Sequence, residues 1–220
     1  MITLIATTHR EKGICTPDEL LKIIEQISPD VIFEEASPVK SDAEYDEIHK
    51  NSLEKLAINN YKEMHSLVCV RVDKDVDHTT AIRFVENFKK MDYIFKDYSP
   101  DYCNVLIKTE ELTERDGFQF LNSDKCLRLF EFKNILEEGM VEKLNLEKLS
   151  KAYKDWRTLH NERENEMIKN IYNYCNSNKY ERALFLVGVA HRKSIMDKIS
   201  ELEKNNTMHL DWNFDFFNIL

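Results

Sequence analysis

Two apolar segments near opposite ends of the 220-residue chain constrain its fold more than any other feature. Ile2–Arg10 and Ala183–Arg192 each begin with a mostly apolar run and end in His-Arg. Such runs are typical of strands buried on both faces, as in parallel sheets covered by helices. If the two strands lie near each other in one sheet, His9 and His191 converge on one edge of that sheet.

The start of the chain has the pattern of a strand, a helix and a second strand. Thr16-Pro17-Asp18-Glu19 is a capping box with proline at the first helical position, and apolar residues then recur at helical spacing. A short buried strand follows at Val31-Ile32-Phe33 and ends at Glu34-Glu35. A strand, a crossover helix and a strand form a right-handed parallel unit, in which sites form beyond the carboxyl ends of the strands. His9 and Glu34 both occupy such a position.

Capping boxes, helical periodicity and apolar runs divide the rest of the chain into further elements. We expect helices at about 41–66, 77–91, 124–138, 145–176 and 193–204. We expect strands at 67–72, 104–108 and 208–212, a loop at 92–101, and Gly139 at the end of a helix. The pattern predicts an α/β fold with a central, mostly parallel sheet flanked by helices. Residues 1–220 should form a single domain, in which residues 92–145 are a helical, lid-like insertion over the strand ends.

The composition bounds the classes of partner. The formal net charge of −9 gives no support for nucleic-acid binding, which needs a basic face. No apolar run approaches the length of a membrane span, and Met1 leads straight into a strand rather than into a signal sequence. The five cysteines are scattered without a C-x-x-C pair, which favours a reducing cytoplasm over a disulfide framework. We therefore expect a cytoplasmic protein whose partner is a small-molecule or peptide substrate, with no nucleic acid and no membrane.

An arginine in the middle of an apolar helix face is the second informative feature. In the helix predicted over 145–176, Trp156, Leu159 and Met167 lie on the same side as Arg163. A buried arginine is costly unless a carboxylate or an anionic ligand pairs with it. Arg163 therefore either forms an ion pair within the core, or reaches a carboxylate at the sheet edge or the oxyanion of a substrate.

Three polar residues at strand ends are candidates for a catalytic site. His9, Glu34 and His191 are a plausible ligand set for a divalent cation, because two imidazoles and a carboxylate leave a position open for water. Without a metal, the same residues could act as general base, orienting carboxylate and second acid. Strand alternation places Glu34 and Glu35 on opposite faces, and this argument does not decide which of them points to the site. Asp73 ends the third strand, where it either supports the site or caps a loop.

Four short motifs follow one another along the chain. They are Ala6-Thr7-Thr8-His9, then residues 29–34 (PDVIFE), 162–167 (ERENEM) and 188–191 (GVAH). In this order they resemble the TraB/Tiki family, which is related to the erythromycin esterases and the haem-binding ChaN lipoproteins. The family pattern is G-x-x-H, PDVV-x-x-E, ERD…M and G-x-G/A-H, and residues 72–75 (VDKD) are similar to its IDRD segment. Ala6 stands where the family has its first glycine.

The resemblance implies a site made of His9, Glu34, Arg163 and His191, and it favours Glu34 over Glu35. Supporting positions are expected at three further residues, Glu162, Asp73 and Glu35. Tiki-type members resemble metal-dependent proteases, erythromycin esterases open a lactone, and ChaN binds haem, so the resemblance does not choose the substrate.

Taken together, these features predict a hydrolase of ester or peptide bonds. His9, Glu34 and His191 would hold manganese, cobalt or zinc, and Arg163 would stabilise the oxyanion. One alternative is a non-catalytic regulatory protein that holds a peptide or a small ligand in the same cleft. Another is that these residues form a purely structural polar network.

Overall fold

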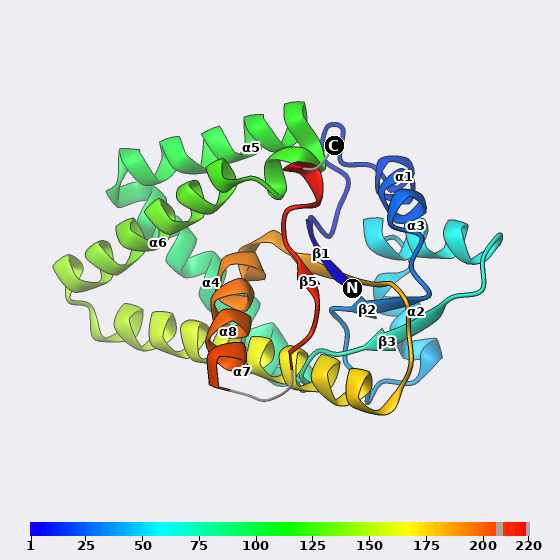
Figure 1. Cartoon of the computed structure of the whole chain (residues 1–220). Helices are drawn as coiled ribbons and strands as arrows, with labels where there is room; N and C mark the ends of the chain where they lie inside the picture. The colour runs from blue at the N-terminus through cyan, green and yellow to red at the C-terminus, as the bar shows by residue number, and fades with distance from the viewer. Residues whose placement is uncertain (206–208, 219–220) are drawn as a thin grey trace.

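The computed structural model describes residues 1–205 and 209–218, and it has an α/β fold built on one sheet (Figure 1). Within these residues the sheet has five strands, all parallel, in the order β3-β2-β4-β1-β5. The strands are β1 (Ile2–Thr7), β2 (Val31–Glu34), β3 (Val68–Arg71), β4 (Ala183–Gly188) and β5 (Trp212–Asn213). The predicted central parallel sheet flanked by helices is confirmed.

The two apolar strands that end in His-Arg are neighbours in the sheet. β1 pairs with β4 from Ile2 opposite Ala183 to Thr7 opposite Gly188. After β1 the chain builds β2 and β3 on one side of this pair, and after β4 it builds β5 on the other. The strand order therefore reverses between β1 and β4. At such a switch point the loops after the two strands part and leave a crevice, which is where ligands bind in open α/β sheets.

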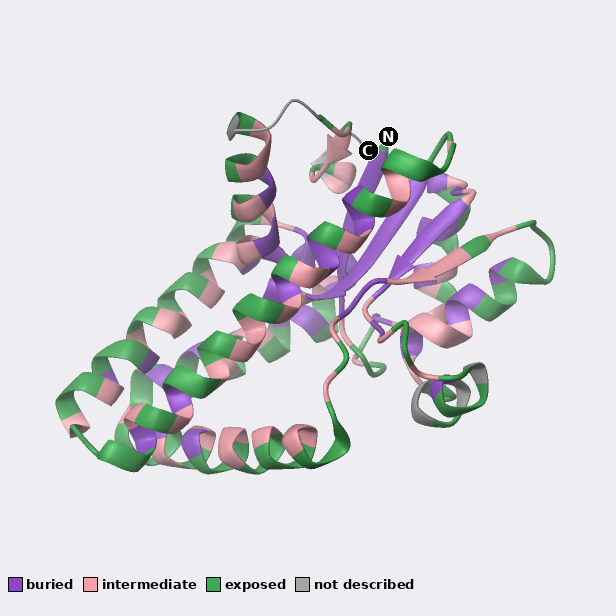
Figure 2. Ribbon diagram, turned by 90° about the horizontal axis from the view of Figure 1, so that it is seen from below, coloured by how far each residue is buried: buried purple, intermediate pink, exposed green. Residues whose placement is uncertain are grey.

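Helices cover both faces of the sheet because the strand side chains are apolar on both. α1 (Pro17–Ile27) and α3 (Leu53–Lys62) pack on one face, in a core that includes Ile32 of β2. α7 (Glu147–Ser177) and α8 (Arg192–Asn205) pack on the other, in a core that includes Phe33. Figure 2 shows the buried strands between these helical layers. The shorter elements are α2 (Asp42–His49), the 3-10 turn η1 (Val189–His191) and η2 (Phe216–Asn218).

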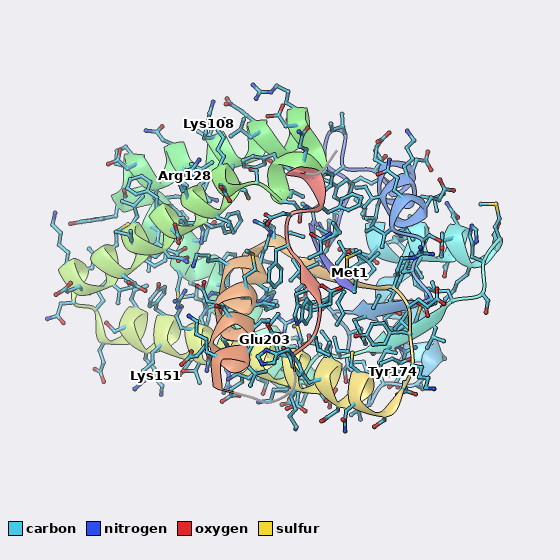
Figure 3. All side chains as sticks on the ribbon, viewed as in Figure 1. Met1, Lys108, Arg128, Lys151, Tyr174 and Glu203 are labelled. Atoms are coloured by element: carbon cyan, nitrogen blue, oxygen red, sulfur yellow. The ribbon has the colours of Figure 1, made fainter. Side chains whose placement is uncertain are left out.

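Long helices extend from one side of the sheet as an arm (Figures 1 and 2). The arm consists of α4 (His78–Tyr98), α5 (Pro100–Leu121), α6 (Asp124–Leu144) and the first half of α7. It has a hydrophobic core of its own, which includes Phe95, Tyr102 and Leu149. Its outer surface carries exposed charged side chains, of which Lys108, Arg128 and Lys151 are labelled in Figure 3. None of the helices in the described part of the chain is long and apolar enough to cross a membrane.

The predictions for residues 92–108 were wrong. Instead of a loop at 92–101, α4 continues to Tyr98 and α5 begins at Pro100, with Ser99 as the N-cap whose side chain accepts from the Tyr102 N–H. A proline at the first helical position starts a helix without losing a hydrogen bond, so Pro100 marks a junction rather than a loop. The expected strand at 104–108 lies inside α5, where Val105 is buried and Ile107 is exposed.

Other boundaries also differ from the sequence pattern. The expected helix over 41–66 is two helices, because Ser52 caps a new helix at Leu53. Gly139 lies within α6, which continues to Leu144 and ends where Asn145 takes up a left-handed conformation. The final strand is Trp212–Asn213, and Met208 lies outside the described residues.

Candidate functional site

The carboxyl ends of the strands form one edge of the sheet, and charged side chains from four elements meet there. Glu35 follows β2, Asp73 follows β3, His191 follows β4, and Arg163 comes from the middle of α7. His9 follows β1 beside them. The site therefore lies where the topology predicts a crevice, at the reversal of strand order between β1 and β4.

Arg163 is the centre of this group. Its Nη2 donates to Oε1 of Glu35 at 2.6 Å and to Oδ2 of Asp73 at 2.6 Å. Its Nε donates to the same Asp73 carboxylate at 3.1 Å. The side chain is only 21% exposed, so the two carboxylates neutralise a largely buried guanidinium. The expectation that Arg163 reaches a carboxylate at the sheet edge describes its position correctly.

Glu35 is a buried carboxylate with several donors. Besides Arg163, the backbone N–H of Gly188 donates to its Oε2 at 2.7 Å, and Nε2 of His191 lies 3.4 Å from its Oε1. Burial alone would raise the pKa of Glu35, but hydrogen bonding to His191 and the charges of His191 and Arg163 lower it below its usual range. Glu35 is therefore an anion that anchors its neighbours and is too weak a base to take a proton from water.

Glu35, and not the expected Glu34, is the carboxylate after β2 that joins Arg163 and His191. Along β2, Ile32 and Glu34 face the α1 and α3 side, whereas Phe33 and Glu35 face the side covered by α7. Arg163 comes from α7, so alternation delivers Glu35 to it and turns Glu34 away. The Glu34 carboxylate accepts a short hydrogen bond from the Tyr45 hydroxyl instead.

His191 lies between two carboxylates. Its Nδ1 is 2.8 Å from Oε1 of Glu164, and its Nε2 faces Glu35. Burial lowers the pKa of His191, but hydrogen bonds to Glu164 and Glu35 outweigh burial and raise it to about 9. The imidazole therefore carries a proton on each nitrogen at neutral pH. Its charge, with those of Arg163 and Lys198, balances three carboxylates, which are Glu35, Asp73 and Glu164.

His160 stacks on His191, with ring centroids 4.7 Å apart, and its ring centroid lies 4.2 Å from that of Trp156. Burial and the nearby charges of His191 and Arg163 lower the pKa of His160 to about 3, so it is neutral. His160, Glu164 and His191 offer ligand atoms that all lie within 4.8 Å of one another, and this is the set in the described residues that could hold a metal ion. A metal there would have to displace the proton of His191 and compete with Lys198, which lies 3.0 Å from Glu164.

The metal set expected from the sequence is not assembled. Glu34 is bound by Tyr45, and both ring nitrogens of His191 face carboxylates of Glu164 and Glu35. His9 belongs to a different local arrangement on the β1 side. The residues present therefore do not fit a cation bound jointly by His9, Glu34 and His191.

His9 is oriented by Glu54, the second residue of α3. Its Nδ1 lies 3.4 Å from Oε1 of Glu54, and that same oxygen accepts from the Thr7 hydroxyl at 2.6 Å. The His9 side chain is 64% exposed, unlike the other groups of the site. The hydrogen bond to Glu54 raises the pKa of His9 above its usual value, with the charge of Glu35 acting in the same direction.

Gly188 brings His9 and Glu35 together. A Cβ atom at this position would lie 3.1 Å from Nε2 of His9 and 3.2 Å from Oε2 of Glu35. Both atoms therefore face the same small space above the end of β4. Glycine at this point lets two polar side chains and a small ligand share the strand end.

Two hollows open at this place. A small cavity of about 30 Å³ has room for one water molecule with polar partners, and its lining includes His9, Glu34, Glu35, Glu54 and Gly188. A larger cleft of about 640 Å³ is lined by His9, Glu35, Asp73 and Arg163 and continues between the strand-end loops and the arm. This volume is in the range of small-molecule sites.

Residues 92–145, expected as a lid, and Glu162, expected as a supporting residue, do not lie at this cleft. No residue of 92–145, a segment the structure describes throughout, lines the cleft that contains His9 and Arg163; some of these residues line a separate hollow behind His160. Glu162 forms an ion pair with Lys74 at the surface rather than joining the buried group. Asp73 and Glu35, expected only to support the site, are the two carboxylates that bind Arg163.

Sequence reasoning missed three residues of the site, which are His160, Glu164 and Glu54. Glu164 follows Arg163 directly and lies one helical turn after His160, a spacing that puts 160 and 164 on one face and could have indicated a pair. Glu54 had no such signal, because its role depends on how α3 packs beside the end of β1.

Comparison with protein-family models, with curated proteins and with solved structures finds no match to this chain.

Proposed function

We propose that the protein hydrolyses ester or amide bonds, including peptide bonds, with a water molecule activated by His9. The observation that carries this proposal is the convergence of His9 Nε2 and Glu35 Oε2 on the space beside Gly188, at the mouth of a cleft that Arg163 also lines. A base, a water-sized cavity and a cationic donor then lie side by side, which are the parts that acyl transfer to water needs.

His9 serves as the general base. Glu54 accepts a hydrogen bond from Nδ1–H, and this leaves the lone pair of Nε2 directed toward the water cavity. The neutral imidazole takes a proton from the water as its oxygen attacks the carbonyl carbon, and later gives that proton to the leaving group. Thr7 holds Glu54 in place through its hydroxyl, so the base is oriented by a fixed carboxylate.

Arg163 stabilises the oxyanion. Asp73 and Glu35 accept from its Nε and Nη2. Nη1 donates no hydrogen bond to a carboxylate of the described residues and lies 3.5 Å from Nε2 of His191. Nη1 is therefore the donor available to charge that develops on a carbonyl oxygen. Fixing the other nitrogens to two carboxylates pre-orients the guanidinium before the substrate arrives.

A metal-dependent form of this hydrolase is the second candidate. Manganese, cobalt or zinc would be held by His160, Glu164 and His191 and would act as a Lewis acid when bound. A ligating imidazole must be neutral, so metal binding would release the proton of His191. Elemental analysis of the purified protein separates the two forms.

The test is a panel of esters and peptides assayed with the native protein and with His9→Ala. We expect His9→Ala to lower kcat by about 10²–10⁴-fold, the usual contribution of a general base. His78→Ala, which removes an exposed histidine at the start of α4, is the matched control and should keep full activity. Equal activity of His9→Ala and the native protein would refute the role of His9. A ligand held tightly in the cleft without turnover would favour the alternative of a binding or regulatory protein.

A further inference from the structure

The cleft that contains the site has two walls of opposite chemical character. One wall comes from the start of α4 and the middle of α7 and is apolar. The other, the cationic wall, comes from the loops after β1, β2 and β3 and from the α2–α3 connection. Its cations Arg10, Lys40, Lys50 and Lys74 outnumber its carboxylates Glu35, Glu47 and Asp73. The apolar wall consists of Val76, Ala81, Phe84, Val85, Trp156 and Leu159. His9 and Arg163 also line this cleft.

The apolar wall is a surface that a ligand could cover. Val85 is 52% exposed although it lines the cleft. Phe84 and Phe88 contact the Trp156 ring, which fixes the aromatic part of the wall. An alkyl or aryl group of a ligand placed here would bury its own apolar surface and that of the wall, removing both from water.

The cationic wall has two cations that are in no ion pair within the described residues. Lys50 pairs with Glu47, and Lys74 pairs with Glu162. Arg10 and Lys40 also line the cleft, and in the part of the chain that the structure describes neither side chain is in an ion pair. The Lys40 backbone is held in place, because Nη1 of Arg71 donates to its carbonyl oxygen at 2.9 Å.

An anionic group on a ligand is directed to Arg10 and Lys40 rather than to Arg163. Glu35 and Asp73 accept from Nη2 and Nε of Arg163, so only Nη1 is left, and in the proposed function that nitrogen donates to the carbonyl oxygen. Arg10 and Lys40 line the cleft and are in no ion pair within the described residues, so they can form charge-assisted hydrogen bonds with a carboxylate.

We propose, building on the hydrolase function above, that the substrates are N-acylated amino acids, which are amides of an apolar acyl chain with an amino acid whose carboxylate is free. The acyl chain lies against the α4–α7 wall, the amide carbonyl lies at Arg163 Nη1, and the carboxylate lies at Arg10 and Lys40. His9 takes a proton from water as the new C–O bond forms. The C–N bond then breaks and the nitrogen accepts that proton, so the products are the carboxylic acid and the free amino acid.

Calorimetric binding to three probes tests this assignment. We expect N-octanoylglycine to bind about tenfold more tightly than its neutral analogue N-octanoylglycinamide, because one charge-assisted contact is lost in the amide. It should bind at least about 100-fold more tightly than N-acetylglycine, which lacks most of the alkyl chain. Arg10→Gln combined with Lys40→Gln should abolish the preference for the acid. Val85→Asn should weaken octanoyl binding and leave acetyl binding unchanged.

Matched controls remove the same groups elsewhere. Lys22→Gln with Lys96→Gln removes two cations outside the cleft, and Ile107→Asn changes an exposed apolar residue on α5. Equal binding of the acid and the amide, or an acid preference that survives Arg10→Gln with Lys40→Gln, would overturn the proposal.

Release of glycine, followed by mass spectrometry in the same samples, separates this proposal from the hydrolase function. Selective binding of N-octanoylglycine without glycine release would retain the ligand class and refute the hydrolase. Hydrolysis of acid and amide at equal kcat/KM would retain the hydrolase and refute the substrate class.

Discussion

At the scale of single residues, His9 determines how the proposed activity depends on pH. The hydrogen bond to Glu54 is the largest influence on its pKa and raises it, the charge of Glu35 also raises it, and burial and Arg163 oppose them. Protonated His9 has no lone pair on Nε2, so kcat/KM for an uncharged ester should fall on the acid side through a pKa above 6.5. Glu54→Gln should move this limb to lower pH and reduce the plateau.

The control for that profile is Glu63→Gln, which removes an exposed carboxylate just after the same helix. It should leave the limb in place. An acid limb that is identical in the native protein and in Glu54→Gln would contradict the assignment of Glu54 as the orienting group.

The same scale shows what strand alternation can and cannot predict. Alternation placed Glu34 and Glu35 on opposite faces of the sheet. Choosing between them also requires knowing which face α7 covers, and the sequence does not give that. Phe33 and Glu35 face α7, so Glu35 meets Arg163. The pairing of Arg163 with a carboxylate was predictable, because a charged residue within an apolar helix face requires a partner. Glu54 was not, because its contact with His9 joins two elements whose relative placement no local pattern reports.

At the scale of elements, the end of α5 completes a strand edge that β5 leaves open. β5 pairs only with Ile2 and Thr3 of β1. Further along β1, Asn122 at the end of α5 accepts from the Ala6 N–H at 2.8 Å and donates to the Ala6 carbonyl oxygen at 3.1 Å. Asn122→Ala would leave both buried groups of Ala6 unpaired, and we expect it to lower the free energy of unfolding by about 2–4 kcal/mol.

Urea unfolding followed by circular dichroism measures this loss. Asn104→Ala, at an exposed position of the same helix, should change stability by less than about 0.5 kcal/mol. If the two variants were equally stable, the side chain of Asn122 would not be what closes the edge of β1.

Elements near the sheet were more predictable than those of the arm. β1, β2, β3 and β4 are short apolar runs with clear boundaries, and β1 lies beside β4 as their shared pattern suggested. In the arm, each helix is only partly buried and packs on other helices, so apolar residues such as Ile107 also lie outside. Because buried and exposed positions both carry apolar residues, residues 104–108 show no helical period, and the sequence alone indicates a strand there.

At the scale of the whole molecule, α7 belongs to two hydrophobic cores. Near its start, Leu149 and Tyr153 pack in the arm, and near its end, Met167 and Ile171 pack against the sheet. The separate arm core could not be foreseen, because sequence patterns indicate that a face is apolar and not which helix covers it. The prediction of one domain over residues 1–220 therefore requires that the two cores, which share α7, unfold together.

The two tryptophans allow that dependence to be measured. Trp156 lies on the arm side of α7 and stacks on Phe88, and Trp212 lies in β5 beside Tyr172. α7 runs through both cores without a break in its helix, and Arg163 in its middle binds the carboxylates after β2 and β3. Opening either core would therefore expose apolar side chains of α7 and strain the other, so we expect a single cooperative transition.

In Trp212→Phe, fluorescence reports only the arm, and in Trp156→Phe it reports only the sheet. Each fluorescence midpoint in urea should coincide with the midpoint from circular dichroism of the same variant; an arm midpoint well below it would mean that the arm unfolds as a separate unit.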